Sequence, residues 1–254
     1  MSGFIVIRDY KPGDERNCQE VIRESTMSTV NTAFFSGLTR EITFQVIILT
    51  SALMFIFLGV PFNICFGSIP VVIALMYVCV WLSHVFKAVQ LNVDMGSIPR
   101  MYMSSEYTGF WVAEVYEKLM DIRNPQSLQF TIINSDESQK MDLSAYRKRI
   151  VGTIAVTRSH NNEDTAWIRR MGVVKSYQRK GIASALVDEV LRFCRDKCYQ
   201  YVELVTTECH DAARELFLNK GFELKQMYHK QIVGSIITVQ MFELMYKLKV
   251  AESP

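Results

Sequence analysis

One long stretch without a charged side chain constrains this chain more than any other feature. It runs from Ile42 to Phe86, and Arg40, Glu41 and Lys87 bracket it. Hydrophobic residues make up 49% of the 254 residues, which is high for a soluble protein of this size. Since an uncharged helix of this length must be buried on every side, the stretch lies either in lipid or in the core of a domain.

The stretch divides into two segments, each about long enough to cross a bilayer as a helix. Pro61 and Pro70 flank a turn-like segment in its middle, and a spanning helix needs roughly 17–25 residues. The dozen or so Leu, Ile, Phe and Val residues from Ile42 to Val60 contribute on the order of −5 kcal/mol to insertion. We therefore predict a membrane hairpin over residues 42–90, with lipid contact through residues 42–86. A shallow re-entrant hairpin and a helical hairpin buried in a soluble domain are the alternatives.

A loop further along the chain has the pattern of an anion-binding helix start. Residues 171–174 form an apolar run typical of a strand, and a helix with one apolar face follows from Ile182. The first N–H groups of a helix lack partners and carry partial positive charge. Gly181, without a Cβ, allows an anion to approach the backbone closely, so the loop suits a diphosphate. An ordinary basic turn before a surface helix is the alternative, and neither a P-loop nor a Rossmann fingerprint occurs.

The remaining pattern predicts an α+β domain, a mixed twisted sheet flanked by helices. A first helix is expected from a cap at Asp14 to about Thr29, and the polar residues 124–149 predict a loop excursion. The expected strands cover residues 4–7, 110–115, 150–156, 166–174, 201–205 and 242–248. We assign residues 1–41 to the first strand and helix of the domain, 42–90 to the inserted hairpin and 91–254 to the main domain.

Charge and cysteine usage exclude two classes of partner. The net charge is only +2, which does not indicate a nucleic-acid partner. The six cysteines are scattered without a metal-type arrangement, so we predict no metal and expect reduced thiols in the core.

Two motifs resemble the GNAT acyltransferase superfamily. Gln178-x-x-Gly181-x-Ala183 after a strand resembles its acetyl-CoA motif, and residues 213–222 resemble its A-x-x-L-Y-x-x-x-G-F segment. Four further segments look like the camello-type membrane N-acetyltransferases, and those around Asn31 and Arg170 are most similar to the aspartate N-acetyltransferase branch. These four are Asn31-Thr32-Ala33-Phe34, Asp94-Met95-Gly96-Ser97-Ile98, Gly109-Phe110-Trp111-Val112-Ala113 and Arg170-Met171-Gly172-Val173. Residues 117–149 have no clear counterpart.

The resemblance implies acetyl-CoA as co-substrate and places it on main-chain groups. The pantetheine arm is expected along the backbone of Met171, Val173 and Val174, and the N–H of Val174 is the candidate oxyanion donor. The residues expected to face the pyrophosphate are Gln178, Arg179, Lys180, Gly181, Ile182, Ala183 and Ser184.

The catalytic side chains are less constrained. The resemblance places Phe217 where relatives usually carry a tyrosine that protonates the CoA thiolate. His210 and Glu208 are candidate general bases, with surface residues as the alternative in both cases. Arg170 is expected to bind a substrate carboxylate, and His160 is a second candidate at the substrate mouth.

These expectations combine into a membrane-bound N-acetyltransferase that acetylates a primary amine, such as that of aspartate. A protein-lysine or cysteine-conjugate acetyltransferase and a catalytically degenerate CoA-binding membrane protein are the alternatives. Arg40 and Lys87 beside the hairpin favour a cytosolic catalytic domain. By resemblance the endoplasmic reticulum membrane is the expected location, with a mitochondrial membrane as the alternative. No oligomeric state follows from the sequence.

Overall fold

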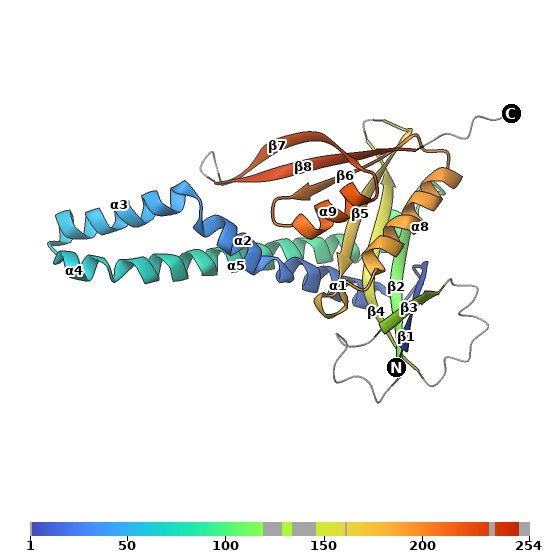
Figure 1. Ribbon diagram of the computed structural model, residues 1–254, viewed down its shortest axis with the longest axis horizontal. Helices are drawn as coiled ribbons and strands as arrows, with labels where there is room; N and C mark the ends of the chain where they lie inside the picture. Colours follow the sequence, from blue (N-terminus) through green and yellow to red (C-terminus); the bar gives the residue numbers. More distant parts are fainter. Residues whose placement is uncertain (1, 119–128, 134–145, 161, 234–236, 249–254) are drawn as a thin grey trace.

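A computed structural model describes residues 2–118, 129–133, 146–160, 162–233 and 237–248. A mixed sheet in the order β3-β1-β2-β4-β5-β6-β8-β7 forms the body of the molecule, and a long helical hairpin projects from it (Figure 1). The strands are β1 (Ser2–Asp9), β2 (Gly109–Lys118), β3 (Gln129–Ile133), β4 (Tyr146–Arg158), β5 (Thr165–Val173), β6 (Tyr201–Thr207), β7 (Glu223–Val233) and β8 (Ile237–Lys247). The expected mixed sheet flanked by helices is confirmed.

The helices fall into a set that covers the sheet and a set that forms the projection. The helices are α1 (Glu15–Ser28), α2 (Val30–Leu38), α3 (Glu41–Leu58), α4 (Phe62–Cys65), α5 (Ser68–Met95), α6 (Ile98–Tyr102), α8 (Ile182–Asp196) and α9 (Asp211–Asn219), with a 3-10 turn η3 (Lys175–Tyr177). Helices α3, α4 and most of α5 make up the projection, and α2 connects it to α1 (Figure 1).

Helices α1 and α8 cover opposite faces of the sheet. A Cβ on Gly172 of β5 would meet Ser25 of α1 at 2.8 Å, whereas one on Gly152 of β4 would meet Leu186 of α8 at 3.1 Å. Gly152 pairs with Val173, the next residue along β5 from Gly172. Since successive strand residues point to opposite faces, the central strands β4 and β5 are buried between the two helices.

The hairpin is apolar on its outside. Only 6% of residues 41–58 and 11% of the best window within residues 62–93 are buried, and both segments are long and apolar enough to cross a membrane. Phe57 and Phe86 are exposed by 77% and 81%. The alternative of a hairpin buried in a soluble domain is therefore wrong.

Helix α5 continues past the hairpin into the domain. At 1.5 Å per residue α3 is about 27 Å long and α5 about 42 Å. The excess length of α5 packs against α1, where Ala88 is 4% exposed and Met95 is fully buried. One rigid element thus connects the hairpin tip to the core.

The structure corrects two local expectations and adds one strand. Asp14 precedes α1 but makes no side-chain cap bond; it binds Arg8 instead. The predicted excursion over residues 124–149 contains β3, which pairs in parallel with β1, and the start of β4. Its remaining parts, residues 124–128 and 134–145, lie outside the described residues. Strand β7, which pairs with β8, was not expected.

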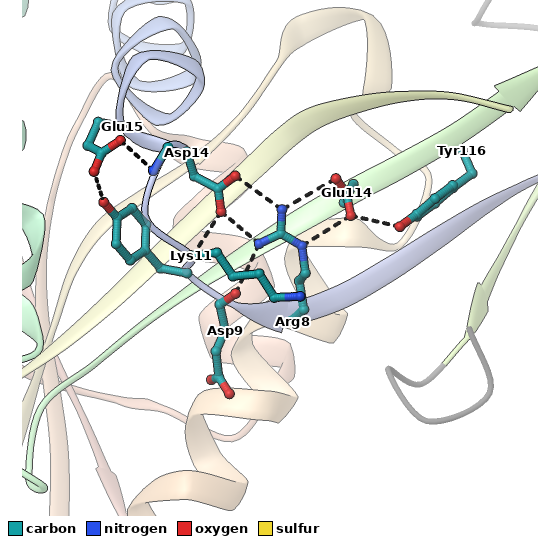
Figure 2. A network of polar contacts seen from close by, with 9 residues as sticks. Arg8, Asp9, Lys11, Asp14, Glu15, Glu114 and Tyr116 are labelled. Atoms are coloured by element: carbon teal, nitrogen blue, oxygen red, sulfur yellow. Dashed lines mark hydrogen bonds and ion pairs between the residues drawn. The ribbon is translucent and has the colours of Figure 1, made fainter. Parts of the chain in front are cut away.

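A partly buried ionic network ties β1 to β2 and to the start of α1 (Figure 2). The guanidinium of Arg8 donates to Asp14 at 2.7 and 3.2 Å and to Glu114 at 3.1 and 3.3 Å. Tyr116 donates to the same Glu114 carboxylate at 2.8 Å. Although burial alone would raise it, the hydrogen bond from Arg8 lowers the pKa of Asp14. The network holds the β1–α1 turn onto the sheet.

Candidate active site

Strands β5 and β6 diverge and leave a wedge in the sheet. They run parallel and pair only where residues 165–167 lie opposite residues 201–203. Beyond that point β5 remains paired with β4 and β6 with β8. We define the wedge as the facing edges of residues 168–173 of β5 and 204–207 of β6. Their peptide groups on these edges can hydrogen-bond an inserted amide-containing chain as a strand would.

A bulge in β5 borders this wedge. The register with β4 shifts between Thr153 and Ala155, which leaves one extra residue on the β5 side. Arg170 lies in this bulge with φ of 52°, a conformation that costs energy for a residue with a side chain. The hydroxyl of the fully buried Thr153 donates to the Arg170 carbonyl at 3.0 Å. The structure thus fixes the position of Arg170 by the backbone.

The direction of the amides corrects one expectation. Amides along an antiparallel strand point alternately toward and away from the partner strand. The N–H of Val174 donates to the carbonyl of Val151 at 2.9 Å, so it points at β4 and not into the wedge. The N–H of Val173 points the other way, and Met171 lies two residues earlier on the same edge. The expectation of Val174 as oxyanion donor is therefore not supported, and the wedge favours Val173 and Met171.

The loop after β5 has the geometry of an anion site. Gly181 precedes α8 with φ of 81° and is exposed, so its backbone is open to a ligand. Arg179 has φ of 62°, and the Gln178 amide donates to the Val173 carbonyl at 3.1 Å. This bond attaches the loop to the end of β5. The wedge and the loop are therefore continuous, as a pantetheine arm joined to a diphosphate requires.

The other loop residues contribute in different ways. Ile182 is 1% exposed and belongs to the core, so only its main chain can face an anion. Ala183 and Ser184 are half-buried in the first turn of α8. Lys180 lies over the ring of Phe130 at 5.5 Å, and a Cβ on Gly181 would lie 3.5 Å from Ile132. Strand β3, which the sequence did not predict, thus flanks the anion loop.

His210 lies at the other side of the wedge, directly before α9. Its Nδ1 shares a hydrogen bond of 2.7 Å with the Thr207 hydroxyl at the end of β6. Burial, and then the charges of Lys87 and His84, lower the pKa of His210 from 6.5 to about 4. The imidazole is therefore neutral at physiological pH, and Nε2 can accept a proton in the tautomer in which Nδ1 donates to the Thr207 hydroxyl.

Glu208, the second candidate base, has a structural partner. Its carboxylate accepts from the Arg40 guanidinium, which also donates to the Thr238 carbonyl of β8. Arg40 precedes α3, so this contact joins the base of the hairpin to the turn between β6 and α9. The arrangement assigns Glu208 to fixing the hairpin and leaves His210 as the better placed base.

Positively charged side chains of α5, β5 and β7 lie within electrostatic range of one another beside the turn between β6 and α9. Lys87 of α5 interacts electrostatically with Arg170, Lys230 and Cys209, and it acts with His84 on His210. We call Arg170, Lys87 and Lys230 the cationic cluster. Sequence reasoning missed Lys87 and His84 in this role, because it treated them as flanks of a membrane segment. Their spacing of three residues on one helix face was the available signal.

Two predicted residues lie elsewhere. His160 is exposed in the turn between β4 and β5. It lies at the opposite end of β5 from Val173, about 26 Å away at strand spacing, so the structure does not bring it to the wedge. Phe217 of α9 is 3% exposed and packs against Phe222 with ring centroids 5.1 Å apart. Phe217 therefore packs in the apolar core.

Within the described residues, no three His, Cys, Asp or Glu side chains gather as metal ligands would.

Cys18, Cys65 and Cys194 are buried, as expected for core thiols. Cys79 and Cys198 are exposed, which corrects the expectation for these two.

Comparison with known proteins agrees with this geometry. The family model described as Acetyltransferase (GNAT) family matches residues 100–222, which include the wedge and the anion loop. N-acetyltransferase 8B of Rattus norvegicus is 26% identical over 65% of this chain and 61% of its own length. N-acetylaspartate synthetase of Danio rerio is 25% identical over 86% of this chain and 66% of its own length. The chain thus spans about two thirds or less of these two relatives.

A solved structure shows the same fold. The crystal structure of a candidate phosphinothricin N-acetyltransferase superposes with a TM-score of 0.52 at 11% identity, over 96% of this chain and 99% of that one. The wedge between parallel strands and the glycine-led helix start provide what acetyl-CoA requires. Residues 100–222 of the chain therefore form a GNAT-type acetyltransferase domain, which is similar in sequence to the two N-acetyltransferases named above.

Proposed function

We propose that this chain transfers the acetyl group of acetyl-CoA to the primary amine of a small acidic amino acid such as aspartate. The observation that carries the proposal is the position of Arg170. It occupies the bulge at the wedge, where the acetyl group of a bound thioester would lie, and interacts electrostatically with Lys87. A guanidinium pairs well with a carboxylate. The likeness to an N-acetylaspartate synthetase supports the same substrate class.

The geometry suggests a role for each group in the transfer. The acceptor amine attacks the thioester carbon, the C–S bond breaks, and the CoA thiolate leaves. The N–H of Val173 would stabilise the developing oxyanion, since it points into the wedge. His210 would take the proton from the attacking amine through Nε2, because Nδ1 is bonded to Thr207. Arg170 would hold the acceptor carboxylate.

Phe217 raises the alternative of a protein that binds CoA without turnover. Its ring is buried and cannot donate a proton to the leaving thiolate. CoA thiolate is a tolerable leaving group near neutral pH, so we propose an active enzyme without this general acid. The lost assistance lowers the rate by on the order of 10²-fold.

We further propose that α3 and α5 insert into a membrane. Both are long and apolar enough, and their large side chains face outward. Because α3 begins and α5 ends at the same base, a hairpin inserted in this way would leave the catalytic domain on one side of the bilayer. The cytosolic face of the endoplasmic reticulum is the proposed location, and imaging of the tagged chain distinguishes it from a mitochondrial membrane.

Release of free CoA by the purified full chain in detergent, with a panel of amines, tests the function. The panel contains aspartate, glutamate, asparagine, alanine, a lysine peptide and a cysteine conjugate. We expect turnover with the acidic amino acids and a gain of one acetyl group in the product mass. Preferred acetylation of the peptide or the conjugate would overturn the substrate assignment.

A glycine pair provides the cofactor control. Gly181→Val introduces a β-branched residue at φ of 81° beside the anion loop and should abolish acetyl-CoA binding measured by calorimetry. Gly13→Val, at φ of 102° in the β1–α1 turn, imposes similar backbone strain away from the wedge. Equal loss of binding in both variants would indicate general damage and not a coenzyme site.

A further inference from the structure

The anion loop between β5 and α8 contains two residues with a left-handed backbone. Arg179 has φ of 62° and Gly181 has φ of 81°. For an arginine this conformation costs free energy, and it persists only where surrounding contacts fix it. Main-chain N–H groups bind an anion tightly when they are already in position, because ordering a loop during binding costs free energy. Contacts that fix the loop therefore contribute to coenzyme affinity.

Tyr177, at the start of the loop, is anchored in the protein interior. It is 3% exposed, and its hydroxyl donates to the carboxylate of Glu117 on β2 at 2.8 Å. Glu117 is itself only 7% exposed. Burial, and then the bond to Glu117, raise the pKa of Tyr177 to about 12, although Arg149 of β4 acts on it in the opposite direction. The hydroxyl therefore keeps its proton and remains a donor at physiological pH.

Strand β3 packs against both ends of the same loop. The rings of Phe130 and Tyr177 are 6.0 Å apart, and the ammonium of Lys180 lies 5.5 Å from the centre of the Phe130 ring. A Cβ on Gly181 would lie 3.5 Å from Ile132. The loop thus rests on β2 through a hydrogen bond and on β3 through apolar contacts.

The bond to β2 is the one whose loss costs most. The Gln178 amide, which donates to the Val173 carbonyl at 3.1 Å, is only partly buried, so water can replace one of its partners. Loss of the Tyr177 hydroxyl would instead leave the buried carboxylate of Glu117 without this donor. A buried polar group that loses its partner costs more free energy than an exposed one.

We propose that Tyr177 and Glu117 form a positioning pair, which holds the anion loop in the conformation that binds the diphosphate of acetyl-CoA. The inference rests on the coenzyme site of the proposed function and deepens it. It assigns part of the coenzyme affinity to two buried side chains outside the motif Gln178-x-x-Gly181-x-Ala183.

Removal of one hydroxyl tests the pair. Tyr177→Phe should raise the Kd of acetyl-CoA by on the order of 10-fold, measured by calorimetry with the full chain in detergent. Tyr199→Phe is the matched control, since Tyr199 is also 3% exposed and its hydroxyl donates to the Tyr107 carbonyl at 2.7 Å beyond the far end of α8. This control should leave the Kd unchanged. An equal loss of affinity in both variants, or none in Tyr177→Phe, would overturn the proposal.

Two changes at Glu117 show which partner of the hydroxyl matters. Glu117→Gln keeps an oxygen that can accept from Tyr177 and should retain most of the affinity, whereas Glu117→Met has no acceptor and should bind as weakly as Tyr177→Phe. Tyr177→Phe combined with Glu117→Met should bind no more weakly than Tyr177→Phe alone, because both changes remove the same contact. Losses that add would show that the two residues act separately.

Hydrogen exchange separates this inference from the proposed function. Without coenzyme, the amides of residues 178–184 should exchange faster in Tyr177→Phe than in the wild type or in Tyr199→Phe. If the wild type binds acetyl-CoA but acetylates no acidic amine, the proposed acceptor fails while these results still support the pair. If the wild type acetylates aspartate and Tyr177→Phe changes neither the Kd nor the exchange, the pair fails and the proposed function stands.

Discussion

Two groups of charged side chains in this molecule differ in their place relative to the wedge. The Arg8 network places one guanidinium between the carboxylates of Asp14 and Glu114, and each of the three side chains is exposed by 14% or less. The cationic cluster brings Arg170 at the wedge within electrostatic range of Lys87 of α5, which also acts on His210. The Arg8 network joins β1, β2 and the start of α1 and serves the fold, whereas the charged groups that border the wedge are placed where a ligand would bind.

The largest expected effect comes from breaking the Arg8 network. Arg8→Met leaves the half-buried Asp14 and the buried Glu114 without their cation, which should lower the free energy of unfolding by about 3 kcal/mol. Denaturant titration of the domain signal in detergent measures it. Activity per folded molecule at low temperature should remain, since no group of the network lies at the wedge. A loss of activity without loss of stability would contradict the structural role.

The next effect concerns the base at the mouth. His210→Gln should lower kcat by on the order of 10²-fold with aspartate as acceptor. Because the pKa of His210 is about 4 in the folded chain, its contribution should be constant above about pH 5 and fall as the pH drops through about 4. The ratio of wild-type to variant rates at each pH cancels the ionisation of the acceptor. An inflection of that ratio near pH 6.5 would argue against a desolvated imidazole.

A loss of selectivity should follow from changing the cluster at β5. Arg170→Gln should raise the KM for aspartate by on the order of 10-fold to 100-fold and alter the unfolding free energy much less than Arg8→Met does. Arg169→Gln is the matched control, because Arg169 is the preceding residue on β5 and is half-buried like Arg170. Initial rates with aspartate and alanine measure both variants. An equal rise in KM for the two acceptors would show that Arg170 does not recognise the side-chain carboxylate, since alanine has only the α-carboxylate.

The smallest effect should come from an ion pair on an open surface. Arg192 and Glu189 pair three residues apart on α8, with the arginine side chain 68% exposed. Arg192→Ala should change the unfolding free energy by only about 0.2–0.5 kcal/mol, in the same titration that is used for Arg8. If Arg192→Ala changed the unfolding free energy as much as Arg8→Met does, burial would not explain the difference between this ion pair and the Arg8 network.

The sequence predicted those parts of the molecule in which local pattern and burial agree. The strand before the anion loop and the amphipathic α8 lie where alternation and helical spacing placed them. The uncharged stretch correctly predicted an exposed apolar hairpin. Each of these segments has a periodicity that a packed or lipid-facing side requires.

The rest depends on contacts between distant segments. Asp14 had the residue type of a helix cap, but the guanidinium of Arg8 binds it more strongly. The amide of Val174 is directed at β4 by a pairing register that no local pattern reveals. Lys87 marked a segment boundary in the sequence and interacts electrostatically with Arg170 because α5 runs on into the domain.

The continuity of α5 connects the hairpin mechanically to the catalytic domain. Helices answer hydrophobic mismatch by tilting, and in the proposed membrane setting the unbroken helix from Ser68 to Met95 would transmit such a tilt to His84 and Lys87, which act on His210. We therefore expect bilayer thickness to change the affinity for the acceptor while leaving the affinity for acetyl-CoA unaffected.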